Sequence, residues 1–195
     1  MAVCASEAYV GAVRNRLKGY FDFEEVPWEL PANFGTWAHC TMTDEKYFLT
    51  RKMSLYTVNS HQFVGLGVFE TVTSEALASV FEAAKRLVVR LGPSPSSMST
   101  DYTFALISER AVETSRIRSE LRRMRKNQGF AFGMRGWADI GLVVVDLENE
   151  TVLTNPFARA QLASVLWSFD GKPVAPAKKS ILSKIPLFRC SCTGG

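Results

Sequence analysis

The sequence lacks the common signatures of nucleotide-dependent and hydrolytic enzymes. It contains no GxxxxGKS/T phosphate-binding loop, no GxGxxG turn that opens a helix, and no GxSxG nucleophile elbow. Gly65 and Gly67 lie inside an expected strand with no helix directly after it, so they do not form a dinucleotide-binding loop. In a strand, the same two glycines indicate a bulge or a close backbone approach. We therefore do not expect a common nucleotide-dependent enzyme.

Long apolar runs are also missing. No uninterrupted run approaches the roughly 18 residues that a membrane-spanning helix needs. Residues 1–7 show no basic segment followed by an apolar one, so we expect no signal peptide. These features predict a cytoplasmic protein that makes no contact with a membrane.

Cysteine and histidine, the usual ligands of soft metals, are scarce. The chain has four cysteines and two histidines: Cys4, Cys40, Cys190, Cys192, His39 and His61. They show neither paired CxxC knuckles nor an HExxH helix, so we expect reduced thiols, no metal and no cofactor. A soft-metal site joining Cys190 and Cys192 to the His39–Cys40 pair is the alternative. The two histidines lie in neighbouring expected strands.

What the chain does contain is the composition of an ordinary globular protein, 47% apolar and 22% charged, with a net charge of +4. Residues 171–195 hold five positive side chains and no acid, which leaves 18 basic against 19 acidic residues elsewhere. The basic character therefore belongs to the end of the chain. We expect one domain over residues 1–170 and a basic tail containing proline and lysine over residues 171–195.

The most apolar segment, Trp137 to Asp146, organises the predicted fold. From Ile140 to Val145 both faces of a strand would be apolar, which is typical of a strand covered on both sides. Helical periodicity predicts helices over residues 7–18, 75–91 (capped by Thr73 or Ser74) and 109–126. A last helix begins at Asn155–Pro156, buries a face that includes Phe157 and Val165, and ends at Asp170–Gly171.

Strands are predicted between these helices. A meander over residues 35–43, 46–57 and 62–70 has turns at residues 42–45 and 59–60, and a strand follows at residues 102–108. Residues 130–134 and 137–146 form a hairpin around Arg135–Gly136, before a short strand at residues 151–154. The expected fold is α+β: a mixed, mostly antiparallel sheet flanked by helices, in the order α-β-β-β-α-β-α-β-β-β-α.

A strongly basic helix is the main candidate for binding. Its positive residues, with one that follows it, are the predicted site for an anion or nucleic acid: Arg116, Arg122, Arg123, Arg125, Lys126 and Arg135. The neighbouring Phe130 and Phe132 are of the kind that stacks on exposed bases. The alternative is a solvated helix face, because arginine is a good helix former whose stem covers apolar surface.

Two carboxylates are the candidates for catalysis. Asp139 interrupts the approach to an apolar strand and needs a partner, such as Arg135, if it is buried. Asp101 begins another expected strand. The alternative is that Asp139 lies at the exposed entrance of its strand.

Four short stretches resemble a family of uncharacterised prokaryotic proteins, a domain of unknown function. They are Gly19-Tyr-Phe-Asp22, Glu45-Lys-Tyr-Phe-Leu49, Ser99-Thr-Asp-Tyr-Thr-Phe104 and Gly141-Leu-Val-Val-Val145. This resemblance implies no activity. The element order also resembles the restriction-endonuclease-like, PD-(D/E)xK, fold. That fold implies an acid-x-Lys motif on the third strand, which residues 62–70 lack.

The sequence thus predicts a non-enzymatic binding or regulatory domain with an acidic partner, either nucleic acid or protein. The alternative is a divergent metal-dependent nuclease or hydrolase that uses Asp101 or Asp139. A homodimer through an unpaired strand edge is compatible with both.

Overall fold

The structure, a computed structural model, describes residues 5–47, 54–92, 97–129 and 137–174. Along the chain these form α1 (Ala5–Leu17), β1 (Asp22–Glu24), β2 (Phe34–Tyr47), β3 (Ser54–Phe69), α2 (Ser74–Leu91), β4 (Ser97–Ser108), α3 (Thr114–Arg123), β5 (Asn127–Gly129), β6 (Trp137–Asp146), β7 (Thr151–Thr154) and a short 3-10 helix, η2 (Ala158–Ala163). The predicted element order and the α+β single-domain class are confirmed.

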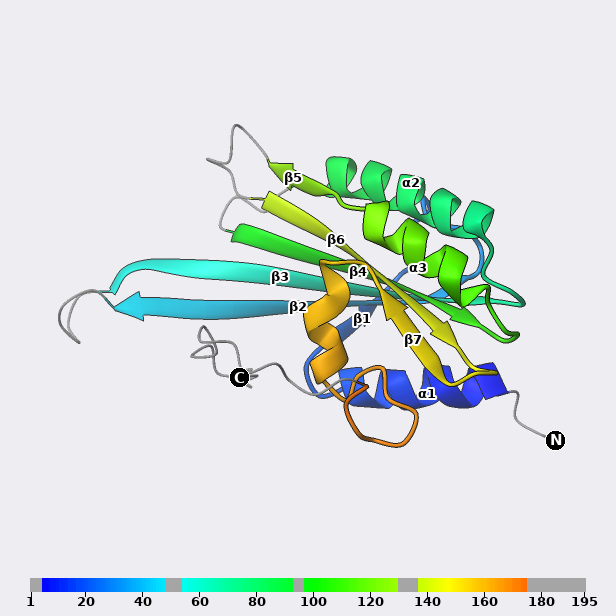
Figure 1. Cartoon of the computed structure of the whole chain (residues 1–195). Helices are drawn as coiled ribbons and strands as arrows, with labels where there is room; N and C mark the ends of the chain where they lie inside the picture. Colours follow the sequence, from blue (N-terminus) through cyan, green and yellow to red (C-terminus); the bar gives the residue numbers. More distant parts are fainter. Residues whose placement is uncertain (1–4, 48–53, 93–96, 130–136, 175–195) are drawn as a thin grey trace.

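All seven described strands belong to one mixed sheet, in the order β1-β2-β3-β4-β6-β5, with β7 also paired to β6. β3, β4 and β6 are parallel to one another, and the remaining pairs are antiparallel. The parallel connections run through α2 and α3, which lie on the same side of the sheet (Figure 1). Because both crossovers use one side, the parallel part has no point at which the strand order reverses, where α/β proteins usually bind dinucleotides.

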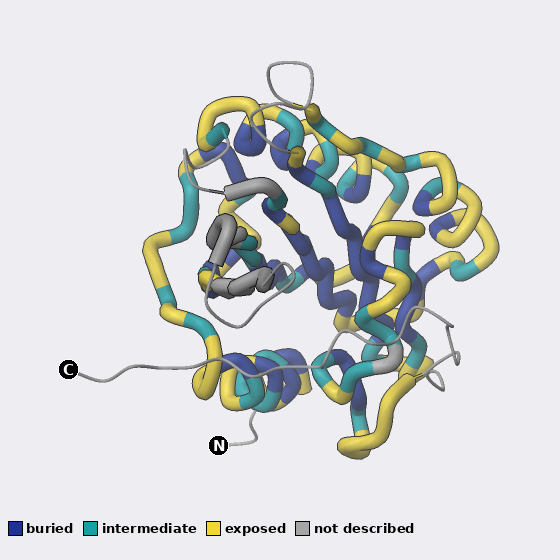
Figure 2. Tube along the Cα trace, turned by 90° about the vertical axis from the view of Figure 1, so that its left-hand side faces the viewer, coloured by how far each residue is buried: buried dark blue, intermediate teal, exposed yellow. Residues whose placement is uncertain are grey.

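The strand β6 lies between two hydrophobic cores, as its sequence predicts. Ile140, Leu142 and Val144 pack with α2 and α3, whereas Val143 and Val145 pack on the other side with α1 and Trp167. Figure 2 shows these buried strands between helices above and below them. A ten-residue strand that is apolar on both faces is therefore stabilised from both sides of the sheet.

The predicted meander is wrong in its boundaries. Residues 42–45 and 59–60, expected as turns, pair with one another across two long strands: Met42 with Ser60 and Thr43 with Asn59. The connection between the two strands falls within residues 48–53, outside the described part. Turn-forming residues are only weakly unfavourable in strands, so cross-strand pairing overrides them. The third strand before α2 is instead β1, at the edge of the sheet.

The helix α3 begins five residues later than predicted, at Thr114. The N–H groups of Glu109 and Arg110 donate to the carbonyls of Phe69 and Glu70 at 3.0 Å, which extends the β3–β4 pairing past the strand end. These backbone groups are therefore committed to the sheet before the helix starts. The short strand β5 pairs antiparallel with the start of β6, with Gly129 opposite Trp137, whereas the predicted turn at Arg135–Gly136 would place Met134 there. The strand expected over residues 130–134 and its turn lie outside the described residues.

The last predicted helix is also wrong in extent. Asn155 caps it as expected, because the Ala158 N–H donates to its Oδ1, but η2 ends at Ala163. Phe157 and Val165, expected to be buried, are exposed, and Trp167 is buried in their place. Its indole N–H donates to Gln161 Oε1, and the Tyr9 hydroxyl donates to its carbonyl. These bonds fix the chain after η2 against α1.

The glycines of β3 allow the close approach that the sequence suggested. A Cβ on Gly65 would lie 3.2 Å from the Trp37 ring, and one on Gly67 would lie 3.0 Å from the Phe34 ring. Each glycine thus makes room for an aromatic side chain of the neighbouring strand. The rings of Trp37 and Phe34 in turn form part of the core under α2.

Candidate functional site

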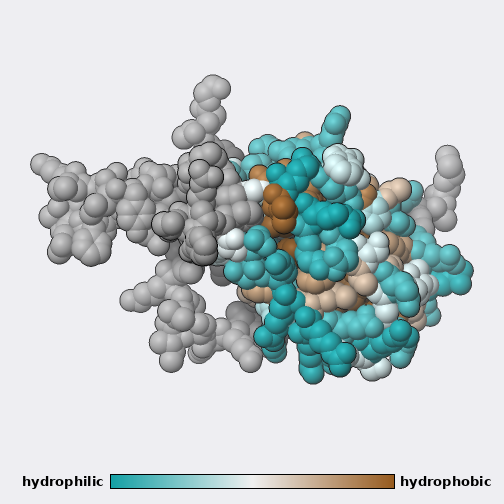
Figure 3. Space-filling model, turned by 90° about the horizontal axis from the view of Figure 1, so that it is seen from above, coloured by the Kyte–Doolittle hydropathy of each residue, from teal (hydrophilic) through white to brown (hydrophobic). Residues whose placement is uncertain are grey.

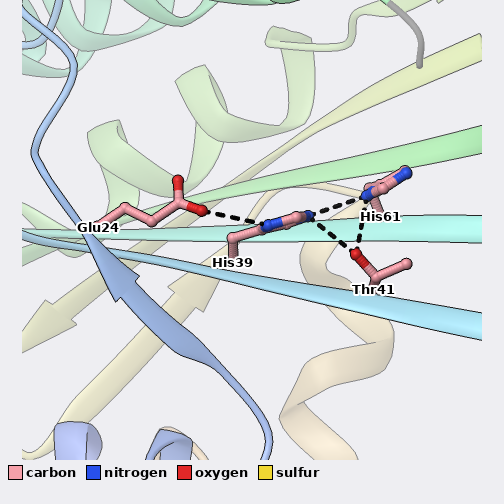
Figure 4. Close-up of polar contacts among 4 residues, drawn as sticks. All are labelled: Glu24, His39, Thr41 and His61. Carbon is pink, nitrogen blue, oxygen red and sulfur yellow. Dashed lines mark hydrogen bonds and ion pairs between the residues drawn. The ribbon is translucent and has the colours of Figure 1, made fainter.

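The two histidines of the chain meet on the face of the sheet that carries α2. His39 is on β2 and His61 on β3, and His39 Nε2 lies 2.9 Å from His61 Nδ1 (Figure 4). The strand register pairs Thr41 with His61 and His39 with Phe63, so the imidazoles are diagonal neighbours on one face. The Thr41 hydroxyl lies 3.4 Å from His39 Nε2 and 3.2 Å from His61 Nδ1. Three donor atoms therefore converge between the two strands.

A carboxylate from the edge strand extends this pair. Glu24 Oε1 lies 3.3 Å from His39 Nδ1. With both rings neutral, the consistent arrangement has His39 Nδ1–H donating to Glu24 and His61 Nδ1–H donating to His39 Nε2. His61 Nε2 is then left as an acceptor. That atom is buried and has no hydrogen-bond partner among the described residues.

The environment keeps His61 neutral. Burial, and then the neighbouring His39, lowers the pKa of His61 below its ordinary value. The free electron pair of its imidazole is therefore available over a wider range of pH than that of an exposed histidine.

Aromatic side chains support the histidines from one side. The rings of His39 and Phe63 stack with centroids 4.3 Å apart, and those of Phe63 and Tyr102 stack 4.9 Å apart. Trp37 stacks on Phe63 at 5.4 Å. These rings pack face to face, so the stacked row is rigid and fixes the orientation of His39.

A groove of about 370 Å³ runs beside these stacked rings, near the end of α2. Trp37 and Phe63 line it together with Glu24 and with Trp28, which is 81% exposed. Its α2 wall is fixed by an ion pair in which Arg90 Nη2 donates to Glu29 Oε2 at 3.0 Å, with a second bond from Nε to Oε1.

Glu29 is held ionised in this wall. Burial alone would raise its pKa, but the hydrogen bonds from Arg90 outweigh this and lower it. The ion pair therefore joins the segment before β2 to the last turn of α2, and Arg90 carries no unpaired charge into the groove.

The basic surface predicted on α3 divides into two parts. Arg116 lies within 4.0 Å of three carboxylates, those of Glu75, Glu113 and Glu120. Arg118, Arg122, Arg123 and Arg125 are exposed and form no ion pair with any residue that the structure describes. Lys126 is half-buried, and Arg135 lies outside the described residues. Figure 3, which looks onto this side, shows a mostly hydrophilic surface with a small hydrophobic patch.

The two candidate carboxylates lie together on the opposite face of the sheet. Asp101 on β4 and Asp139 on β6 are register partners, and Asn127 on β5 donates to Asp139 Oδ1 at 2.6 Å. Burial, followed by the charge of Asp139, raises the pKa of Asp101 to about 6. Among the described residues, no three His, Cys, Asp or Glu side chains converge as metal ligands.

The sequence indicated Asp101 and Asp139 as candidate site residues. It did not indicate Glu24 or the contact between His39 and His61. The alternation Trp37, His39, Thr41 does place a histidine on one face of a strand. Its partner depends on the register of a second strand whose predicted ends were wrong, so the pair was not detectable from local pattern. Glu24 lies between the first expected helix and the meander, where the sequence predicts no strand.

These features describe an α+β domain with a helix-covered mixed sheet and a polar cluster at its β1–β2–β3 edge. Residues 5–166 match the family described as Domain of unknown function (DUF8052), and the chain belongs to this family. No curated protein and no solved structure matches the chain. The expectation that the chain belongs to a family of unknown function is confirmed. The likeness to the restriction-endonuclease-like fold has no support among these comparisons.

Within the described ranges, no helix combines the length and the apolar character that crossing a membrane requires.

Proposed function

We propose that this chain is a non-enzymatic binding domain whose α3 surface contacts an acidic partner. The observation that supports the proposal is a set of exposed arginines on α3 and directly after it that form no ion pair with any described residue: Arg118, Arg122, Arg123 and Arg125. By contrast, Arg90, Arg110 and Arg116 each form an ion pair with a glutamate. The fold does not need the other guanidinium groups to stay unpaired. These groups are available to bind carboxylates or phosphates.

The arrangement of these arginines favours a shared contact. Arg118 and Arg122 are separated by one helical turn, so their side chains lie on one face, roughly 6 Å apart along the axis. Arg123 and Arg125 follow at the point where α3 ends at Met124. Arg116 is unsuitable for the same contact, because its three glutamates already neutralise it.

Alanine substitution of Arg122, Arg123 and Arg125 tests the proposal. We expect the wild-type chain to bind single-stranded RNA or polyglutamate at low salt, and the triple variant to lose at least about tenfold in affinity. Fluorescence anisotropy measures both polymers. For RNA, the slope of log affinity against log salt should fall by about 0.7 for each lost phosphate contact.

A matched control removes the same charge from the other side of the molecule. Lys18, Arg159 and Lys172 are exposed and lie outside the α3 surface, so their triple alanine variant should bind nearly as well as wild type. The proposal fails if neither polymer binds, or if both triple variants lose the same affinity. A cytoplasmic location remains a prediction that accompanies this proposal.

A second candidate function is metal-dependent hydrolysis at Asp101 and Asp139. The adjacent carboxylates and the raised pKa of Asp101 favour it, because a divalent cation would relieve their repulsion. This reading expects magnesium or manganese to raise the melting temperature, and Asp139→Asn to abolish that rise. An unchanged melting temperature in wild type removes the hydrolase from consideration.

A further inference from the structure

We propose that His39, His61 and Thr41 form the protein part of a binding site for a divalent first-row transition metal that prefers imidazole, such as Zn²⁺, Ni²⁺ or Cu²⁺. The inference rests on the cluster at the β1–β2–β3 edge and is independent of the arginines on α3. The sequence spacing predicted no metal site. Such spacing motifs detect only ligands that lie close together in the chain. Here the two histidines are 22 positions apart and meet through the sheet.

The distances among the donor atoms fit one metal ion. His39 Nε2, His61 Nδ1 and Thr41 Oγ1 form a triangle with sides of 2.9, 3.2 and 3.4 Å. Ligands bound to such a metal at about 2.0 to 2.1 Å lie about 2.9 to 3.4 Å from one another in octahedral or tetrahedral geometry. The triangle therefore has the dimensions of one face of a metal's coordination shell. When the metal binds, the proton that His61 carries on Nδ1 in the metal-free cluster moves to Nε2, so that Nδ1 can act as a ligand.

The position of Glu24 gives independent support. A histidine that binds a metal through one ring nitrogen usually donates the N–H of the other nitrogen to a carboxylate, which fixes the tautomer and the ring orientation. His39 has this arrangement, with Nδ1 at 3.3 Å from Glu24 Oε1 and Nε2 directed at His61. The stacking of His39 on Phe63 also fixes the orientation of the His39 ring.

The site is accessible and incomplete. The side chain of His39 is 22% exposed and that of Glu24 is 48% exposed, so an ion can reach the cluster from solvent. The described residues provide two imidazoles and one hydroxyl, and no third His, Cys, Asp or Glu joins them. Water or a small anion would therefore occupy the remaining coordination positions.

Histidine NMR tests the proposal without any change to the site, because the chain has only two imidazoles. The sample is the full chain with Cys4, Cys190 and Cys192 replaced by serine, so that thiolates near the chain ends do not compete. We expect Zn²⁺ to shift the ring ¹⁵N signals of both histidines and to saturate at one equivalent. The proposal is overturned if either imidazole keeps its signals in excess Zn²⁺.

Variants then assign the roles of the individual side chains by calorimetric Zn²⁺ titration. His61→Gln and His39→Gln should abolish the one-equivalent binding, and Thr41→Val should weaken it. Glu24→Gln should lower the affinity about 10- to 100-fold, because the group that accepts the His39 Nδ1–H loses its charge. Glu25→Gln, at the next and also exposed position, is the matched control and should bind as the parent does. Equal affinity of the Glu24→Gln and Glu25→Gln proteins, or undiminished binding by His61→Gln, contradicts the proposal.

Discussion

Aspartate side chains have opposite environments at the two ends of the parallel strands β4 and β6. At their C-terminal ends, Asp146 is fully buried and accepts hydrogen bonds from the Val112 N–H and from both the backbone and the side chain of Asn149. At their N-terminal ends, Asp101 lies beside a second carboxylate, Asp139. The first arrangement stabilises an ionised carboxylate, and the second opposes it.

The pKa values follow this difference. Burial alone would raise the pKa of Asp146, but its hydrogen bonds outweigh burial and lower it. Burial and the charge of Asp139 raise the pKa of Asp101 to about 6. The polar groups at the C-terminal ends therefore stabilise the fold, whereas the adjacent carboxylates at the N-terminal ends destabilise it. Groups held at such a cost are more often functional than groups that stabilise the fold.

Asn155, beside the middle of β6, has all of its side-chain polar atoms paired, as Asp146 does. It fills the edge of β6 between β5 and β7, where it accepts from the Leu142 and Ala158 N–H groups and donates to the carbonyls of Met124 and Ile140. One buried amide thus joins β6 to the end of α3 and the start of η2. By contrast, His61 Nε2 on β3 is buried and has no hydrogen-bond partner within the described ranges.

The largest effect is expected at Asn155. Asn155→Asp keeps the shape but removes two donors and places a charge against two carbonyls, so it should lower the free energy of unfolding by about 3 to 5 kcal/mol. Urea denaturation measures this loss. Asn33→Asp is the control, because Asn33 is exposed and donates to a single carbonyl, that of Val68; it should cost less than about 1 kcal/mol. Similar losses at both positions would mean that the β6 edge is not specially dependent on Asn155.

Much of this fold follows from local sequence pattern. The apolar run of β6 and the long apolar stripe of α2, including its Thr73 cap, each specify their element without reference to the rest of the chain. Wherever a boundary depended on a distant partner, the prediction failed. The start of α3 is set by backbone bonds to the end of β3, and the end of η2 is set by the burial of Trp167 against α1.

The candidate sites divide in the same way. Arg122 and Arg123 could be placed on an exposed helix face from periodicity, and Asp139 could be placed at a strand entrance. That Asp101 lies opposite Asp139, and that Arg116 is surrounded by glutamates from two helices, requires the register of the sheet and the packing of α2 against α3. The histidine cluster requires three strands at once, and no local signal contains that information.

The opposite behaviour of the two aspartates can be tested in one comparison, the urea stability of Asp146→Asn and Asp101→Asn from about pH 4 to pH 7. The folded pKa of Asp146 lies below its ordinary 3.8, so its contribution is present above that pH and lost as the pH falls. Asp146→Asn should therefore cost about 2 to 3 kcal/mol across this range, and less only below about pH 4.

The folded pKa of Asp101 lies above 3.8, so its cost appears as the pH rises through about 6. Asp101→Asn should stabilise the protein near pH 7, by only about 0.5 to 1 kcal/mol because part of the side chain is open to solvent, which screens the repulsion. This gain should vanish near pH 4. Opposite signs for the two variants near pH 7 are the result that we predict. Destabilisation by both would show that the N-terminal ends of β4 and β6 are built for stability as the C-terminal ends are, and would contradict the account.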